Sequence, residues 1–132
     1  MSSLLGFDFG SHKIGIAVGQ TVTATASPLT TLSYIKQKPD WNGIEKLISE
    51  WKPDTIIVGL PYQMDDKEAE LAVRAKKFAR QLQGRFKIPV EMIDERLTSK
   101  EASNRLGKKA AKDATLVDSM AAKLILETWL NR

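Results

Sequence analysis

"LLGFDFGSHKIGIAVGQ", residues 4–20, is the stretch that decides how the fold begins. Its two apolar runs, residues 4–9 and 14–20, are separated by the short polar segment GSHK, which predicts a β-hairpin. One acid, Asp8, interrupts the first run. Because a carboxylate is uncommon in a central strand and costly to bury without a partner, we expect Asp8 to bind a ligand or to act in catalysis. The alternative is a carboxylate that accepts hydrogen bonds from the amides of the turn.

Length and composition indicate one ordinary globular domain spanning residues 1–132. The chain has no cysteine and a single histidine, His12, which excludes thiolate metal sites and disfavours a histidine-built zinc site. No apolar run approaches the roughly 20 residues of a membrane helix, and the N-terminus lacks the features of a signal peptide. We therefore expect a cytoplasmic protein with no membrane partner. The net charge of +4 favours a polyanionic partner.

The rest of the chain predicts alternating strands and helices. A Thr-rich strand at 24–32 contains Pro28, which cannot donate to a neighbouring strand and so predicts a sheet edge. Asp40 is a candidate N-cap, and Gly84 is the expected end of the second helix. The expected helices cover residues 41–51, 65–83, a segment from Thr98 and 116–130, and the later strands cover 55–61 and 88–94. An antiparallel hairpin continued by βαβ crossovers gives an α/β fold: a mixed five-stranded sheet flanked by helices.

Further acids follow the last strand and begin the last helix. Asp94 and Glu95 precede Arg96, so they form either a solvated turn with a local ion pair or a metal-binding group. Asp118 lies three residues after Thr115, and the pair resembles a capping box in which Asp replaces Glu. Sites in open α/β sheets form outside the carboxyl ends of the parallel strands. A helix lying across the sheet would bring Asp118 to that end, near Asp8.

Three converging carboxylates without thiols form a hard oxygen site suited to Mg²⁺ or Mn²⁺. Two such cations activate water and stabilise the leaving oxygen of a phosphodiester. Basic side chains would contact the phosphates, although a run of lysines is otherwise simply a solvated face. The candidates are Lys13, Arg96, Lys100, Arg105, Lys108, Lys109 and Lys112, the last three in an expected loop at 107–115.

Four segments in sequence, FDFGSHKIGIAVGQ, IIVGLPYQMD, DERLTSKEA and VDSMAAKLILE, resemble the YqgF family, also described as RuvX-like Holliday junction resolvases or pre-16S rRNA nucleases. The resemblance implies an RNase H-like fold and a cytoplasmic, metal-dependent nuclease that processes the 5′ end of the 16S rRNA precursor. It implies Asp8, Glu95 and Asp118 as the catalytic acids, with Asp94 as an additional metal ligand. Many RNase H-like nucleases carry the second acid on the strand beside the first, whereas the matching stretch here, residues 59–61, has none.

Several functions remain open on the sequence alone. The substrate implied by the resemblance is RNA, the 16S rRNA precursor, alone or within ribosomal particles. Branched DNA is the alternative, and cutting it symmetrically would require a homodimer in place of a monomer. A non-catalytic nucleic-acid-binding or ribosome-assembly factor is a third possibility. An actin-like or sugar-kinase fold is disfavoured, because those folds close two domains over a nucleotide and this chain has room for one.

Overall fold

The computed structural model describes residues 3–60, 66–94 and 114–131 of the 132-residue chain. Its strands are β1 (Ser3–Phe9), β2 (Lys13–Gln20), β3 (Thr25–Ser33), β4 (Thr55–Leu60) and β5 (Val90–Asp94). Its described helices are α1 (Trp41–Trp51), α2 (Asp66–Phe86) and α4 (Ala114–Leu130). The strands form one sheet in the order β3-β2-β1-β4-β5. β1 is antiparallel to β2 and parallel to β4, and β4 is parallel to β5, which confirms the expected mixed sheet.

The hairpin and the edge strand form where the sequence predicts them. β1 and β2 pair from Ser3 opposite Gln20 to Phe9 opposite Ile14. β3 lies at the edge of the sheet, and Pro28 pairs with Ala17 at the point where the register shifts by one residue. A bulge at a sheet edge tolerates a residue that cannot donate a ladder hydrogen bond.

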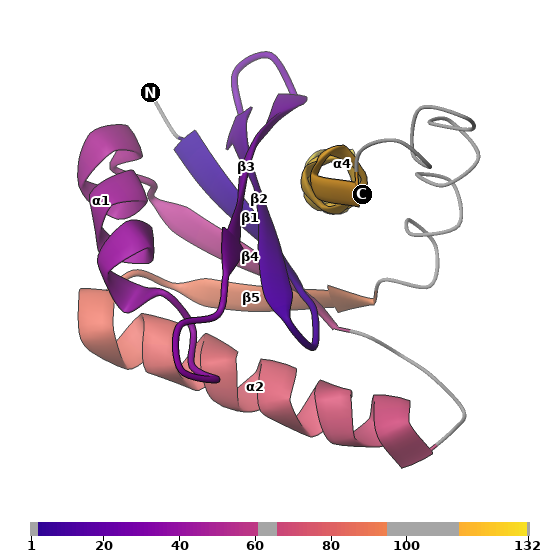
Figure 1. Cartoon of the computed structure of the whole chain (residues 1–132). Coiled ribbons are helices and arrows are strands. Elements are labelled where there is room, and N and C mark those ends of the chain that lie inside the picture. The colour runs from indigo at the N-terminus through magenta and orange to yellow at the C-terminus, as the bar shows by residue number, and fades with distance from the viewer. Residues whose placement is uncertain (1–2, 61–65, 95–113, 132) are drawn as a thin grey trace.

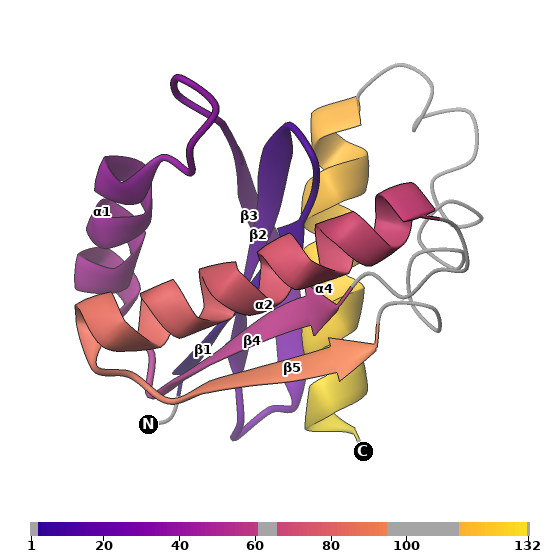
Figure 2. The same ribbon diagram turned by 90° about the horizontal axis from the view of Figure 1, so that it is seen from below.

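The helices cover the two faces of the sheet unequally. Figures 1 and 2 show α1 and α2 on one side and α4 alone on the other. Because side chains alternate along a strand, Leu5, Phe7 and Phe9 of β1 pack with α1 and α2. Leu4 belongs to the smaller cluster under α4. Asp8, four residues after Leu4, has the same parity and faces α4.

Local signals account for the ends of α1. The Asp40 carboxylate accepts a hydrogen bond from the Gly43 N–H at 2.9 Å, which confirms the N-cap. The helix ends at Lys52, which adopts a left-handed conformation before Pro53. None of the described helices is long and apolar enough to cross a membrane.

Two expectations about helix ends are wrong. Gly84 does not end α2, which continues to Phe86 and is followed by Lys87 in the left-handed conformation. The longer helix brings Phe86 into the core cluster beside Trp41, at 6.4 Å between ring centroids. α4 begins at Ala114, so Thr115 is the second residue of the helix and not the residue that precedes it. The expected helix from Thr98 and the expected basic loop at 107–115 lie outside the described residues.

Candidate active site

Asp8 lies on the α4 face of the sheet, between two glycines of the neighbouring strands. It is the penultimate residue of β1, and its register partners are Gly15 of β2 and Gly59 of β4. Residues in register point to the same face of a sheet, and neither glycine has a side chain there. The half-buried Asp8 carboxylate therefore has no side chain beside it in register on either neighbouring strand.

α4 approaches this face closely because glycine and alanine line it. A Cβ added at Gly6 would lie 2.5 Å from Leu126 Cγ, so only glycine permits the observed distance. A Cβ added at Gly19, which pairs with Leu4 near the start of β1, would lie 3.5 Å from Leu130 Cδ1, four residues further along the helix than Leu126. The helix therefore runs opposite to β1, and it begins at the end of the sheet where the hairpin turns (Figure 2).

This polarity places the first half of α4 near Asp8. Position 118 is two helical turns before Leu126, about 12 Å along the helix axis toward the carboxyl end of β1. Positions 118, 122 and 126 lie on one row of the helix, and Ala122 and Leu126 are both fully buried against the sheet. The backbone geometry therefore brings Asp118 and Asp8 to the same end of the molecule, although the Asp118 side chain lies outside the described part.

The third group of acids follows β5. Asp94 is the last residue of that strand and pairs with Leu60 of β4. Since β4 lies between β1 and β5, the end of β5 is two strand spacings from β1, about 10 Å. β4 carries glycine in register with Asp8, so the strand next to β1 supplies no acid there. The Asp94 side chain and the whole of Glu95 lie outside the described residues.

The turn that follows Asp8 is held by a half-buried tyrosine, Tyr34. The Gly10 N–H donates to the Lys13 carbonyl at 3.0 Å, and a Cβ at Gly10 would lie 2.7 Å from that oxygen. The Tyr34 hydroxyl donates to the Gly10 carbonyl at 2.5 Å. Burial raises the pKa of Tyr34 to about 12 despite the nearby charge of Arg74. The phenol therefore remains a hydrogen-bond donor at neutral pH.

The donor set of this end fits a hard divalent cation. Asp8 offers carboxylate oxygens, and its register partners, Gly15 and Gly59, have no side chains. Among the side chains that the structure describes, no three of the types Asp, Glu, His and Cys gather into a metal-binding group. Asp8 is thus the one expected ligand whose side chain is described, and further ligands would have to come from the ends of β5 and α4.

Of the seven predicted phosphate-binding residues, Lys13 is the one that lies among the described residues. Lys13 begins β2 and is half-buried. The other six, Arg96, Lys100, Arg105, Lys108, Lys109 and Lys112, lie outside the described residues. The tyrosine behind the turn and the two flanking glycines were not foreseen. The glycines are visible in the sequence, but only the strand register shows that they flank Asp8.

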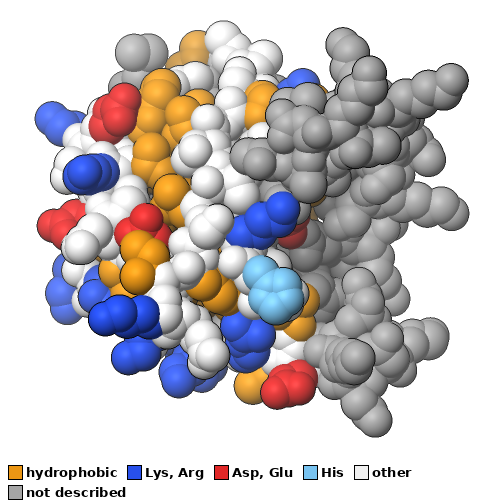
Figure 3. All heavy atoms as spheres, in the orientation of Figure 1, with side chains coloured by type: hydrophobic (Ala, Val, Ile, Leu, Met, Phe, Trp, Pro, Cys, Tyr) orange, Lys and Arg blue, Asp and Glu red, His pale blue; other side chains and the backbone are white. Residues whose placement is uncertain are grey.

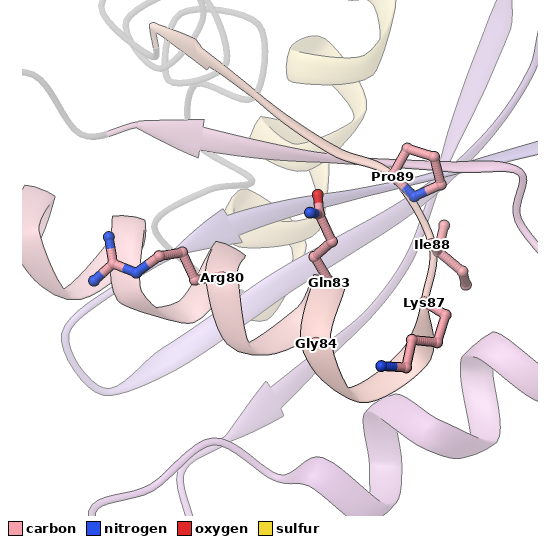
Figure 4. Close-up of a pocket in the computed structure, with 6 residues that line it drawn as sticks. All are labelled: Arg80, Gln83, Gly84, Lys87, Ile88 and Pro89. Carbon is pink, nitrogen blue, oxygen red and sulfur yellow. The ribbon is translucent and has the colours of Figure 1, made fainter.

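A hollow at the opposite end of the sheet is not part of this site. It is lined by Arg80, Gln83, Gly84, Lys87, Ile88 and Pro89 (Figure 4). Pro89 directly precedes β5, so this hollow lies at the amino ends of the parallel strands. Gln83 accepts a hydrogen bond from the Val90 N–H at 3.2 Å, which indicates a structural role.

Comparison with known proteins shows a single consistent family. The family model described as "RuvX: Holliday junction resolvase" matches residues 2–132. A protein of Saccharophagus degradans named "Putative pre-16S rRNA nuclease" is 52% identical over 96% of this chain and 92% of its own length. A protein of Pseudomonas putida with the same name is 51% identical over 96% of this chain and 93% of its own length.

Several solved structures with a similar backbone are resolvases. The fowlpox virus resolvase in complex with Holliday junction DNA is 12% identical, with a TM-score of 0.60 over 98% of this chain and 97% of that one. Thermus thermophilus RuvC in complex with a Holliday junction is 18% identical, with a TM-score of 0.52 over 95% of this chain and 92% of that one. These similarities confirm the RNase H-like fold.

Proposed function

Because this chain belongs to the RuvX family of Holliday junction resolvase-like proteins, we propose that it is a nuclease that hydrolyses phosphodiester bonds, with residues 1–132 acting as one domain. The observation that carries the proposal is the position of Asp8, a carboxylate between two glycines at the carboxyl end of the central strand. α4 approaches this end and brings a second acid, Asp118, toward it.

We propose that Asp8, Glu95 and Asp118 hold the metal, Mg²⁺ or Mn²⁺, with Asp94 beside them. Alternation along β5 supports Glu95: Ile93 is in register with Gly59 on the Asp8 face, and extending the strand by two residues returns to that face. Position 94 falls on the opposite parity, which favours a supporting role. A bound divalent cation would lower the pKa of a water molecule and stabilise charge on the phosphate oxygens.

The proposed substrate is RNA, the 16S rRNA precursor, free or within ribosomal particles. The names of the relatives that share about half of their residues with this chain support it. A DNA resolvase is the second candidate, favoured by the description of the family. Symmetric cutting of a four-way junction would require a homodimer, whereas a monomer suffices to trim an RNA end.

Cleavage of a structured 16S precursor fragment with Mg²⁺ or Mn²⁺ tests this function. Wild type should cut it, and Asp8→Asn should lose about 10³-fold in rate while binding the RNA, because a lost metal ligand costs several kcal/mol of transition-state stabilisation. A four-way DNA junction is tested as the alternative substrate under the same conditions. Equal cutting by Asp8→Asn would contradict the proposed role of Asp8. Cutting of the DNA alone would replace RNA by DNA as the substrate.

A further inference from the structure

The outer surface of α2 carries an unusual run of positive charge. Residues 71–90 contain six cations, Arg74, Lys76, Lys77, Arg80, Arg85 and Lys87, and no acid. Figure 3 shows Lys and Arg side chains gathered along the lower edge of the molecule, where α2 lies. The acids of α2, Asp66, Glu68 and Glu70, all lie in its first two turns, so the positive charge is concentrated in the rest of the helix.

Part of this charge lines a groove of about 390 Å³ between α2 and the segment that leads from β3 to α1. The groove is referred to below as the basic groove. Its lining contains four cations and no acid. The residues are Phe9, Tyr34, Gln37, Lys38, Pro39, Trp41, Arg74, Lys77, Phe78, Gln81 and Arg85.

The two arginines of the basic groove are held in place by aromatic rings. The Arg85 guanidinium lies 4.2 Å from the centre of the Trp41 ring. The Arg74 guanidinium lies 5.7 Å from the ring centre of Phe9 and 5.8 Å from that of Tyr34. Stacking orders a guanidinium without neutralising its charge. Both arginines are therefore positioned to bind an anion without first losing side-chain freedom.

A second hollow connects the basic groove to the hairpin turn that follows Asp8. This hollow of about 680 Å³ shares Tyr34, Gln37 and Arg74 with the groove and adds Glu70 and the hairpin residues Ser11 and His12. Ser11 and His12 come three and four residues after Asp8. The span from Arg74 to Arg85 is about 16 Å along the helix, which is the length of about five stacked nucleotides.

We propose that the basic groove binds a single-stranded segment of the substrate nucleic acid at a distance from the bond that is cut. The proposal rests on the proposed nuclease function. Lys38, Lys77 and the two arginines contact phosphates, and the amides of Gln37 and Gln81 contact base edges. A single strand leaves the Watson–Crick edges of its bases free for these amides, whereas a duplex does not. The basic groove lies on the α1 and α2 face of the sheet and Asp8 lies on the α4 face. A strand bound at both places therefore passes around the β1–β2 hairpin.

Binding of a labelled oligouridine of about twelve nucleotides to the full chain, without divalent metal, tests this proposal. The variant Lys38→Gln/Lys77→Gln removes two exposed charges from the groove and leaves the stacked arginines intact. The matched control is Lys46→Gln/Lys76→Gln, which removes two exposed lysines outside it: Lys46 on α1 and Lys76 on the side of α2 that faces β5.

The groove variant should bind on the order of tenfold more weakly, and its slope of log affinity against log salt should fall by about 1.4, or 0.7 for each lost phosphate contact. The control should bind as wild type does. Three results would overturn the proposal: no binding by wild type, an equal loss in both variants, or competition by a duplex of the same length at the same concentration. Cleavage by wild type with metal is measured separately. If wild type does not cleave but the groove variant still binds more weakly than the control, the proposed nuclease function is wrong and the proposed binding site stands.

Discussion

Phenylalanine rings pack the face of the sheet beneath α1 and α2, whereas the face beneath α4 combines aliphatic side chains with alanine and glycine. The first core contains Phe7, Phe9 and Phe78 together with four isoleucines. The second combines Ala17, Ala26 and Ala122 with a few aliphatic residues, and Gly6 lies among them. Bulk supplies buried apolar area and therefore stability. Small residues let one helix approach the sheet and reach the end where Asp8 lies.

The largest effect on stability is expected from Phe78→Ala on the first face. Phe78 is fully buried and packs against the rings of Phe7, Phe9 and Trp41, at 5.7, 5.0 and 5.5 Å between centroids. Its removal should lower the free energy of unfolding by about 3–5 kcal/mol. Urea unfolding measures this. Val73→Ala, on the exposed side of α2, is the control and should change stability by no more than about 0.5 kcal/mol. A loss below about 1 kcal/mol for Phe78→Ala would contradict the role assigned to this face.

On the second face, Gly6→Ala should destabilise by adding bulk. The new Cβ would lie 2.5 Å from Leu126 Cγ and about 3 Å from both Leu126 methyl carbons. The expected cost is about 1–3 kcal/mol, because α4 must move away from the sheet. The cleavage rate should fall as well, since the same movement displaces Asp118 from Asp8.

A double-mutant cycle sharpens this prediction. Leu126→Ala removes the atoms that the new Cβ meets, so Gly6→Ala should cost less in that background than in wild type. Additive losses would mean that Leu126 does not set the distance between α4 and the sheet. The close approach of α4 would then not depend on the small residues of that face.

The contrast between the faces also explains what the sequence predicts and what it does not. The hairpin, the Asp40 cap and the edge position of Pro28 follow from local patterns, and the structure confirms each of them. The pairing of Asp8 with two glycines depends on strand order and register, which are tertiary properties. The prediction that α2 ends at Gly84 is wrong because Phe86 contacts the core only if the helix continues, and this contact outweighs the low helix propensity of glycine. The arginines of the basic groove are conspicuous as charges, but their stacking on rings from other elements is not.

Tyr34→Phe tests a contact between the first face and the active-site turn. The change removes the hydrogen bond to the Gly10 carbonyl and leaves the ring in place. We expect a loss of about 1 kcal/mol in stability, the usual net contribution of such a bond. The cleavage rate should fall while RNA binding in the absence of metal remains unchanged, because the turn follows Asp8 directly. An unchanged rate would show that the turn is held without Tyr34.

The pH dependence of stability provides a second readout for Tyr34. Its pKa is raised by burial from 10.0 to about 12, so between these values the unfolded chain loses a proton that the folded chain keeps. The corresponding stabilisation is complete below pH 10 and is lost as the pH rises toward 12. Tyr34→Phe should therefore show a shallower loss of stability over this range than wild type. Identical slopes would contradict the burial of the hydroxyl.

The smallest effect expected is a gain in stability from Gly84→Ala. Gly84 lies inside α2, is exposed, and a Cβ added there would meet nothing within 4 Å. Alanine in a helix interior is more favourable than glycine by about 0.8–1 kcal/mol, largely because the unfolded chain has fewer conformations to lose. The melting temperature should rise by roughly 3 °C, with cleavage unchanged. The same Gly→Ala replacement is thus expected to stabilise at position 84 and to destabilise at position 6, where α4 occupies the space. If Gly6→Ala proved equally harmless, the close approach of α4 would not depend on glycine, and small side chains would not be what brings that helix to Asp8.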